Sequence, residues 1–464
     1  MPSGPERFVS DPAYTTEFTK ARELLLAHPG RWHVIYHYDG DGIASASSLL
    51  RALLRLGYAV QASPLLGVER ARMAQLLQDH PGPTLIVDTG ASWLDLYPAH
   101  AAPVIVLDHH KYPGAPTPPS LPAHVAFVNP LDWGVDGMVE LCAGTLSWLY
   151  TVFLDPRNWD NAAWGLSGAI ADRQHQEGFR GLTRTLVAEA AARSLVVEQS
   201  RPPLFGATVG EAVTRSVDPY LRGLSGRPEE VRSFLSMMGM DASRPFGELG
   251  SAELKRLTAA LHQRLTAQGT RPEFCDILTL PSYFVPALGT TALELSILQN
   301  ATGRIGEPGV GIALALGDRQ AWTRAREAEN AWRTGVMAGL RRIEDGAIHT
   351  MDAIQWFESP DTTLAGTQAG LAMNYLLDPR RPVFVASQLE HATKVSGRGT
   401  LHLVDQGLDL ALTCRTAAAS VGGEGGGHRV AAGATLPPGT WQAFLTEANR
   451  LIASQLPHVE SSAA

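Results

Sequence analysis

The sequence has few cysteines, and their placement excludes a disulfide framework. Cys142, Cys275 and Cys414 are the only cysteines in 464 residues, they lie far apart, and they form no CxxC pair. An odd number of widely spaced cysteines is unlike the disulfide-stapled domains of secreted proteins and fits a reducing compartment. We therefore expect a cytoplasmic protein.

Long apolar runs are missing as well. The sequence contains no run of about 18 apolar residues, the length that a membrane-spanning helix requires. The N-terminal stretch MPSGPERFVSDPAYTTEF contains no apolar segment of the kind found in a secretory signal peptide. The sequence therefore predicts neither a membrane span nor a signal peptide.

Positive charge is in deficit. The chain has 38 lysines and arginines against 46 aspartates and glutamates, a formal net charge of −8. Such a chain is unsuited to coating long nucleic acid through general basicity. The net charge does not exclude a local basic channel, and it does not exclude a small anionic substrate held by metal ions. The 45% hydrophobic and 18% charged residues indicate a globular protein, and 464 residues are enough for two or three domains.

The first third of the chain alternates helices with apolar strands. Helices are predicted over 15–28 and 43–57, and strands over 31–36, 83–90 and 103–110. The last two strands are nearly continuous apolar runs, which is typical of strands buried on both faces of a parallel sheet. This alternation predicts an open α/β sheet, whose functional sites lie at the carboxyl ends of the strands.

The predicted secondary structure changes twice along the rest of the chain. It is mostly helical from about 139 to 340, and short strands return after about 346. Within these regions we predict amphipathic helices over 227–241 and 251–265, strands over 353–357, 382–388 and 408–414, and a closing helix near 439–454. The predicted fold class is therefore α/β, with a helical middle and a smaller C-terminal α/β domain.

Acidic and histidine side chains gather where the three N-terminal strands end. In an extended HYDGDG segment, alternate side chains point the same way, and Gly40 and Gly42 let the backbone turn closely. Carboxylates crowded at one sheet edge repel each other unless a cation lies between them. The residues concerned are His37, Asp39 and Asp41, then Asp88, then Asp108, His109 and His110, and finally Asp172 after a helical stretch.

This donor set favours particular metals. Oxygen-rich ligation with a few imidazoles suits Mn²⁺ or Mg²⁺ better than structural zinc. Two such ions about 3.5–4 Å apart promote in-line attack on phosphorus.

Each motif alone also has an ordinary explanation: DxDG is commonly a turn, Asp88 could cap a helix, Asp172 could be a solvated or capping carboxylate, and DHH recurs by chance. The order of all four, each in a suitable structural context, favours a two-metal site.

In that order, HYDGDG, IVDTG, VLDHHK and GAIAD resemble the four motifs of the DHH phosphoesterase superfamily. GGEGGGHRVAAGATLP at 422–437 resembles the glycine-rich signature of the companion DHHA1 domain. LQNATGRIGEPGVGIALALGD at 298–318 resembles the asparagine-glycine-arginine segment of the RecJ-like branch, where a long linker helix follows it.

The resemblance implies roles for the acidic and histidine residues. Asp88 would bridge two ions, and His37 would be a ligand or would support one, because its spacing is that of archaeal RecJ-like proteins. The predicted catalytic pair is His110, which contacts the scissile phosphate, and Asp108, which orients the histidines. The metal ligands that the resemblance implies are His37, Asp39, Asp41, Asp88, His109 and Asp172.

Substrate would be held by segments far along the chain from the metal motifs. Arg304 is a candidate phosphate clamp, because a guanidinium can grip two oxygens at once. The glycine run before His428 could be a flexible loop, but its bare N–H groups favour an anion-binding cradle. The predicted substrate-binding residues are Arg304, Ser396, Arg398, Gly425, Gly426, Gly427 and His428.

The sequence allows more than one interpretation of two segments. Residues 178–290 match no motif, and we interpret them as an inserted helical subdomain, a lid or a dimer surface, which leaves a homodimer open. In 319–342, Arg319, Arg326 and Arg333 share one helical face, which is a solvated linker face or a nucleic-acid track. The predicted domains are 1–177 (DHH), 178–345 (insertion, RecJ-like segment and linker helix) and 346–464 (DHHA1).

The sequence thus predicts a Mn²⁺-dependent phosphodiesterase with two ions, with Mg²⁺ as the other candidate. Its expected substrates are short oligonucleotides and linear or cyclic dinucleotides, hydrolysed to 5′-nucleotides. We expect no OB-fold after DHHA1, unlike bacterial RecJ, and this favours short substrates over the alternative, a 5′→3′ exonuclease on single-stranded DNA or RNA. A non-catalytic scaffold would have lost ligands, and here every core motif is intact. A plain phosphomonoesterase or pyrophosphatase is disfavoured by the DHHA1 and RecJ-like segments.

Overall fold

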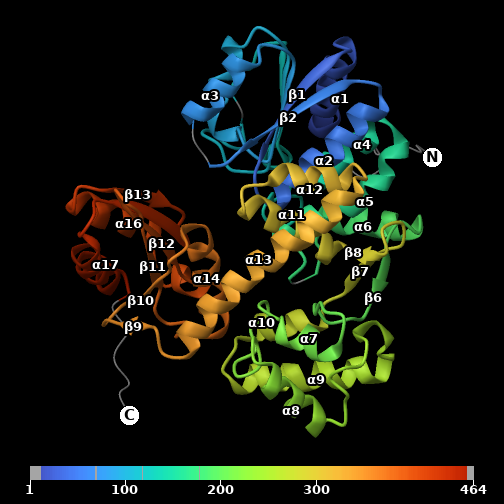
Figure 1. The fold of residues 1–464 in the computed structure, drawn as a ribbon. Helices are drawn as coiled ribbons and strands as arrows, with labels where there is room; N and C mark the ends of the chain where they lie inside the picture. Colours follow the sequence, from blue (N-terminus) through green and yellow to red (C-terminus); the bar gives the residue numbers. More distant parts are fainter. Residues whose placement is uncertain (1–11, 68–69, 118, 177, 457–464) are drawn as a thin grey trace. The chain divides into compact units, whose positions relative to one another are not determined.

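The computed structural model describes residues 12–67, 70–117, 119–176 and 178–456, so most of the N-terminal stretch lies outside the described residues. Among those described, no helix combines the length and apolar character needed to cross a membrane. The chain divides into two compact units, which we describe separately (Figure 1). The domain boundaries after 177 and 345 stay predictions. The first unit contains Met1–Arg201 and Leu280–Asn330, and the second contains Pro202–Thr279 and Ala331–Ala464.

A five-stranded parallel sheet forms the centre of the first unit, as predicted. The strands are, in spatial order, β2 (Ala59–Leu65), β1 (Arg31–His37), β3 (Thr84–Val87), β4 (Val104–Leu107) and β5 (Val125–Val128). β3, β4 and β5 are buried along their whole length. The strand order reverses between β1 and β3, and open α/β sheets bind ligands at the carboxyl ends of such a pair.

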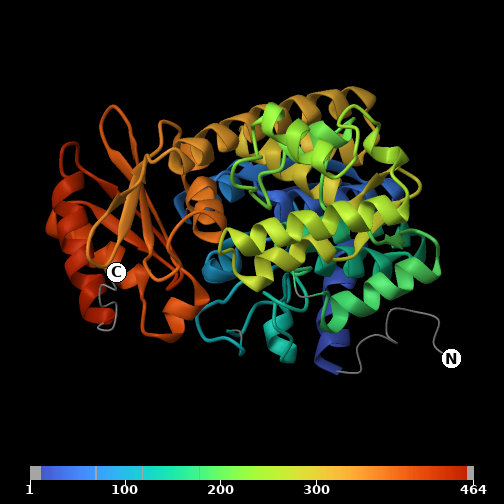
Figure 2. The ribbon, with the colours of Figure 1, turned by 90° about the horizontal axis from the view of Figure 1, so that it is seen from below.

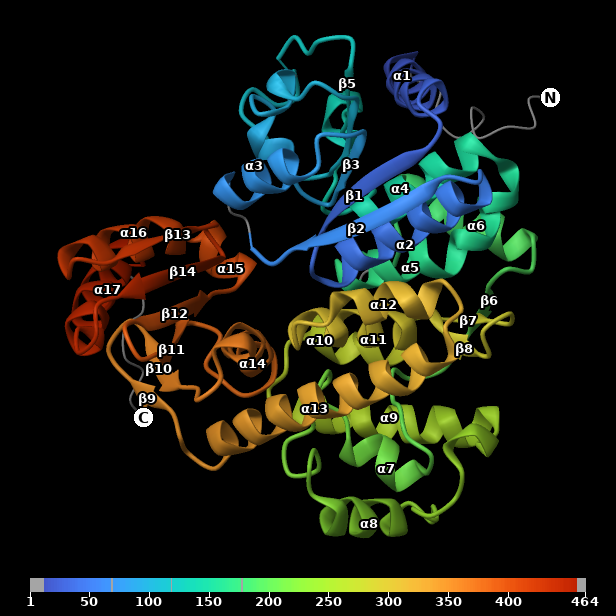
Figure 3. The same ribbon diagram turned by 45° about the horizontal axis from the view of Figure 1, so that its top comes forward.

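Helices cover both faces of this sheet. Because successive side chains of a strand point to opposite faces, Ile86 and Val87 of β3 belong to two different cores. Figure 3 shows α3 on one side of the strands and α2, α4 and α5 on the other. These helices are α2 (Gly40–Arg55), α3 (Arg70–Asp79), α4 (Ala143–Leu154) and α5 (Ala162–Ala171).

The segment 280–330 returns to the first unit. Gln299 of α11 donates a 3.1 Å hydrogen bond to Ser47 of α2, and Leu298 and Ile312 join the main core. The RecJ-like segment therefore packs on the helix that begins beside the metal motifs. The remaining elements here are α1 (Pro12–Ala27), α6 (Gly181–Ala192), α11 (Ala292–Arg304), α12 (Pro308–Ala315) and a small antiparallel sheet of β6 (Val197–Gln199), β7 (Ser282–Val285) and β8 (Thr290–Thr291).

Helix α13 (Arg319–Glu344) runs from the first unit into the second. Nε of Arg324 donates a 2.7 Å hydrogen bond to Oε2 of Glu307. Arg333 is only 8% exposed and donates a 2.9 Å hydrogen bond to the carbonyl of Arg215. The interpretation of Arg319, Arg326 and Arg333 as one solvated face is therefore wrong at Arg333, whose side chain is used inside the second unit.

The second unit contains a six-stranded mixed sheet in the order β13–β14–β12–β11–β10–β9. Phe384 of β11 packs with Cys414 and Phe444 in the core under one face. The C-terminal helices, red in Figure 2, lie along the strands. The strands are β9 (His349–Thr350), β10 (Gln355–Glu358), β11 (Val383–Gln388), β12 (Thr393–Arg398), β13 (Glu424–Gly427) and β14 (Ala431–Leu436). The helices are α7 (Val209–Thr214), α8 (Pro228–Met237), α9 (Ser251–Ala267), α10 (Pro272–Cys275), α14 (Thr362–Tyr375), α15 (Leu401–Asp405), α16 (Leu410–Ser420) and α17 (Trp441–Gln455).

The predicted strand over 408–414 is wrong, because this segment begins α16. Asp409 caps the helix by accepting a 2.8 Å hydrogen bond from the N–H of Leu412. Leu410, Cys414 and Ala417 are buried at helical spacing. The short apolar run LDLALTC suits either structure, and the alanines that follow it continue the helix.

Candidate metal centre

The first motif folds as the end of a strand and the start of a helix. Asp39 is the N-cap of α2 and accepts a 3.2 Å hydrogen bond from the N–H of Gly42. A Cβ at Gly42 would lie 2.1 Å from the carbonyl oxygen of His37, so only glycine allows this fold-back. Our prediction that His37, Asp39 and Asp41 point the same way from one extended segment is therefore wrong, because the helix already begins at Gly40.

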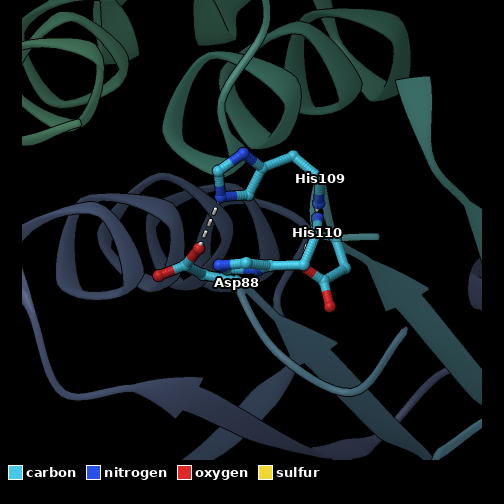
Figure 4. Close-up of side chains that lie close together, drawn as sticks. Asp88, His109 and His110 are labelled. Atoms are coloured by element: carbon cyan, nitrogen blue, oxygen red, sulfur yellow. Dashed lines mark hydrogen bonds and ion pairs between the residues drawn. The ribbon is translucent and has the colours of Figure 1, made fainter. Parts of the chain in front are cut away.

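Asp88 follows β3, and its carboxylate lies between His37 of the first motif and His109 of the third. Its backbone has φ 57°, a left-handed conformation that is rare for a residue with a side chain and is often found at functional sites. Oδ2 lies 3.4 Å from Nδ1 of His37, whereas Oδ1 lies 3.2 Å from Nε2 of His109. Figure 4 shows the carboxylate turned toward the His109 ring. The two oxygens of one carboxylate thus face two different histidines.

His109 presents one definite nitrogen to this centre. Its Nδ1 lies 2.9 Å from the carbonyl oxygen of Gly137, which can only accept, so Nδ1 carries a proton. In the neutral ring Nε2 is then an acceptor, available to a metal. That atom lies 3.5 Å from Oδ2 of Asp172 and 3.9 Å from Oδ2 of Asp41.

The predicted ligands form two clusters. Within each, one ligand atom from every residue lies within 4.8 Å of the others. The first cluster is His37, Asp39 and Asp88, and the second is Asp41, His109 and Asp172. Asp88 belongs to the first and touches the second through His109. The structure therefore brings together all six residues that the sequence indicated as ligands, and their metal-binding role stays a prediction.

The charges of the second cluster need compensation. Burial, together with repulsion from Asp172 and Asp88, raises the pKa of Asp41 well above its ordinary value. Burial also raises the pKa of Asp172 to about 6; Asp88 adds to this rise and His109 opposes it. For His109, burial lowers the pKa, but Asp172 and Asp88 outweigh it and the pKa is raised well above its ordinary value.

The donor atoms fit divalent cations. Asp88 Oδ1 and Asp172 Oδ2 are buried oxygens that accept no hydrogen bond from any described residue, and both face the same nitrogen, Nε2 of His109, at 3.2 and 3.5 Å. Such atoms are rare unless something outside the chain satisfies them. Carboxylate oxygens and imidazole nitrogens are the ligands of Mn²⁺ and, for the oxygens, of Mg²⁺.

Asp108 and His110 lie beside the clusters. Oδ1 of Asp108 accepts a 2.8 Å hydrogen bond from Nδ1 of His110, and Oδ2 accepts one of 2.8 Å from the N–H of Ala91. Burial would raise the pKa of Asp108, but His110 and these hydrogen bonds lower it to about 2. The carboxylate thus stays charged and orients the ring of His110.

Arg304 ends α11 beside the first motif. Its Nη1 donates a 3.1 Å hydrogen bond to the hydroxyl of Tyr38, and its guanidinium lies 5.4 Å from the centre of that ring. A Cβ at Gly303 would lie 1.9 Å from the carbonyl of Tyr38, so this glycine allows the close approach. Sequence reasoning missed Tyr38; its place between His37 and Asp39 was the available signal.

The other predicted substrate residues lie together in the second unit. Ser396 and Arg398 alternate on β12, and a Cβ at Gly366 of α14 would lie 2.8 Å from Nη2 of Arg398 and 3.7 Å from Oγ of Ser396. In the pairing of β12 with β14, Arg398 lies opposite Ala431. The carbonyl of Ala431 accepts a 2.8 Å hydrogen bond from the N–H of exposed His428.

The glycine run before His428 is a strand in the structure. Gly425, Gly426 and Gly427 belong to β13, which pairs with β14 and forms an edge of the sheet. They are not a flexible loop. β13 pairs with β14 on one side only and lies at the edge of this sheet, the position in which a strand can keep unused N–H groups.

Comparisons with known proteins concern the C-terminal part of the chain and the fold. The family model for the DHHA1 domain matches residues 363–454. Uncharacterized protein MJ0831 of Methanocaldococcus jannaschii is 26% identical over 444 residues, covering 94% of this chain and 97% of that protein.

Solved structures share the fold. RecJ of Thermus thermophilus in complex with Mn²⁺ aligns with a TM-score of 0.59 and 20% identity over 96% of this chain; the chain spans about half of that protein's length (55%). CDC45 of Entamoeba histolytica aligns with a TM-score of 0.66 and 10% identity, covering 95% of this chain and 98% of that one. At these identities the likeness concerns the fold.

Proposed function

We propose that the chain is a member of the DHH/DHHA1 superfamily, with the fold of its RecJ-like branch, and that it is a two-metal phosphodiesterase that releases 5′-nucleotides. One observation carries this proposal: the two oxygens of Asp88 face His37 and His109, which belong to two separate ligand clusters. A carboxylate so placed is suited to bridging two ions.

The residues that would hold the ions are those of the two clusters. His37 and Asp39 would serve one ion, Asp41, His109 and Asp172 the other, and Asp88 both. When bound, two divalent cations make water a strong nucleophile at neutral pH and offset the charge that develops on the phosphate oxygens. Mn²⁺ is our preferred cofactor and Mg²⁺ the second, because the donor set contains imidazoles as well as carboxylates.

The chain's own groups complete the reaction. The water oxygen forms a bond to phosphorus as the bond from phosphorus to the 3′-oxygen breaks, and the products are a 5′-phosphate and a 3′-hydroxyl. His110, held through Nδ1 by Asp108, offers Nε2–H to a non-bridging oxygen of the phosphate, where charge accumulates. Arg304 grips a second phosphate oxygen from the side of Tyr38.

We propose that short oligonucleotides and linear or cyclic dinucleotides are the substrates. Residues 346–464 contain 7 lysines and arginines against 10 aspartates and glutamates, so the DHHA1 part offers no basic track for a long strand. The side chains expected to meet substrate there are Arg398 and His428. The three cysteines are free and buried, which supports a reducing, cytoplasmic setting.

The second candidate is a RecJ-like 5′→3′ single-strand exonuclease. The fold shared with RecJ over 96% of this chain favours it. A non-catalytic scaffold is disfavoured, because the ligand clusters are complete.

Timed digestion with Mn²⁺ tests the proposal. A length series from dinucleotide to 30-mer, with a cyclic dinucleotide alongside, should give the highest kcat/KM for the shortest substrates and 5′-nucleotides as products. Preference for the 30-mer with stepwise release from its 5′ end would select the exonuclease. No cleavage of any member, with Mn²⁺ bound, would contradict both.

A further inference from the structure

Asp41 is held from one side by the first turn of another helix. Its Oδ1 accepts hydrogen bonds from the N–H of Gly144 at 2.9 Å and from Sγ of Cys142 at 3.2 Å, and Oδ2 accepts one from the N–H of Ala143 at 3.0 Å. All three donors belong to the start of α4, where Cys142 is the N-cap. The carboxylate is 1% exposed, so this turn fixes its rotation in a buried setting.

The space for Oδ1 exists only because two glycines face it. A Cβ at Gly168 of α5 would lie 2.5 Å from this oxygen and 3.0 Å from Cα of Gly144, and a Cβ at Gly144 would lie 2.7 Å from the same oxygen. Contacts between carbon and oxygen this short do not occur. Helices α4 and α5 therefore cross at a pair of glycines directly beside Asp41.

The two oxygens of Asp41 are consequently unequal. Oδ1 already has two donors and is enclosed by Gly144 and Gly168. Oδ2 has one donor, from Ala143, and points toward Nε2 of His109 at 3.9 Å. A carboxylate whose rotation is fixed in this way can offer one oxygen to a cation.

We propose that Cys142, Gly144 and Gly168 are positioning residues that make Asp41 a ligand through Oδ2 alone, for the single ion shared with His109 and Asp172. This inference rests on the proposed two-metal function. It adds a prediction that the clusters alone do not make: disturbing this support weakens one ion and leaves the other in place. Among the described residues, the hydrogen bonds from this turn go to Asp41 and not to His37, Asp39 or Asp88, the residues that would hold the other ion.

Calorimetric titration of the metal-free full-length protein with MnCl₂ tests the inference, and Gly168→Ala is the main variant. Its added methyl group must displace Oδ1 of Asp41. The matched control is Gly165→Ala, in the same buried helix, whose methyl group would meet Trp148 at 2.6 Å and not Asp41. We expect wild type and Gly165→Ala to bind two ions, and Gly168→Ala to bind one normally and the other at least about tenfold more weakly, the scale seen for groups that support a ligand.

Cys142→Ala serves if Gly168→Ala does not fold, because it removes the Sγ donor and adds no atoms. It should weaken the same ion several-fold, and Cys142→Ser, which restores a donor, should recover most of the affinity. Wild-type affinity for both ions in Gly168→Ala, or in Cys142→Ala, overturns the inference, as does equal weakening in Gly165→Ala. A wild-type protein that binds no Mn²⁺ would instead overturn the proposed function itself.

Discussion

Asp108 holds the ring of His110 by a 2.8 Å hydrogen bond between Oδ1 and Nδ1. The aspartate side chain is 1% exposed and the histidine side chain 47%, so a fixed, buried carboxylate supports a ring that reaches solvent. Burial lowers the pKa of His110, but Asp108 outweighs it and the pKa is raised. The imidazolium form, which donates from Nε2, therefore persists to higher pH than it would without Asp108.

Asp108→Asn should therefore lower kcat by about 10–100-fold, a range common for residues that orient another group. Because the negative charge that raises the pKa of His110 is lost, the imidazolium disappears at a lower pH. The alkaline limb of the kcat–pH profile should move to lower pH. Profiles of both proteins at saturating Mn²⁺ check this.

The control for this variant is Mn²⁺ titration, which should be unchanged because Asp108 is not one of the proposed ligands. Reduced kcat with an unmoved alkaline limb would mean that Asp108 does not act through the charge of His110.

Removal of Asp88, the proposed bridging carboxylate, should disable the proposed metal centre. Asp88→Ala is expected to lower activity by more than about 100-fold and to reduce the bound Mn²⁺ from two ions to one or none, since one residue contacts both clusters. EDTA should abolish wild-type activity and Mn²⁺ should restore it. Asp95→Ala, which removes an exposed aspartate paired with Arg70, is the matched control. Near-normal kinetics of Asp88→Ala at saturating Mn²⁺ would rule out the bridging role.

The proximity of the proposed ligands could be predicted from the sequence because parallel strands bring their carboxyl ends to one edge. His37 ends β1, Asp88 directly follows β3, and Asp108 to His110 directly follow β4 of the same sheet, so their proximity follows from the strand pattern. What this pattern could not show is the start of α2 at Gly40, which separates Asp41 from His37 and Asp39.

Contacts between residues far apart in the sequence could not be predicted, for a different reason. Cys142 and Gly168 reach Asp41 only because α4 and α5 cross beside it, and nothing in the spacing of residues 41, 142 and 168 indicates that crossing. Similarly, the edge position of β13 depends on its pairing with β14, so the glycine run alone could not distinguish a strand from a loop.

Residues of the DHHA1 part should affect substrate affinity separately from metal binding. Arg398→Ala and His428→Ala are expected to raise KM or Kd by about tenfold each, roughly the loss of one hydrogen-bonded contact to a substrate phosphate, with both Mn²⁺ ions still bound. Arg429→Ala, which changes the exposed neighbour of His428, should leave KM unchanged. Loss of Mn²⁺ in the first two variants would show that their roles are misassigned.

A histidine pair distant in sequence from DHH, made of buried His33 and half-buried His80, makes stability depend on pH. His33 is 4% exposed, and burial, followed by repulsion from His80, lowers its pKa to about 4. The folded-state pKa lies below the unfolded value, so this contribution is full above about pH 6.5 and is lost as pH falls toward 4.

His33→Gln should therefore flatten the dependence of unfolding free energy on pH in that window, by up to about 3 kcal/mol. Urea denaturation from pH 7 to 4.5, below which other groups dominate, measures it. Parallel curves for both proteins would contradict the prediction.

The dependence of activity on salt should distinguish short from long substrates. A protein that grips a long strand releases counterions at each phosphate contact, so its affinity falls steeply with salt. In α13, Arg324 and Arg326 are paired with Glu307 and Glu294, and Arg333 is buried, which leaves this helix with less positive charge for a strand than its sequence suggests.

We therefore expect kcat/KM for a dinucleotide to change only several-fold between about 50 and 200 mM NaCl, and to exceed that for a 30-mer at every salt concentration. Arg319→Ala, at the exposed start of α13, should leave kcat/KM unchanged for the dinucleotide and for the 30-mer. The dinucleotide has few phosphates that could reach this position. Arg304→Ala should lower kcat/KM for the dinucleotide at each salt concentration, since its proposed contact lies beside the metal ligands. Faster, steeply salt-sensitive degradation of the 30-mer, weakened by Arg319→Ala, would instead assign α13 a role as a strand track and the protein a role as a processive exonuclease.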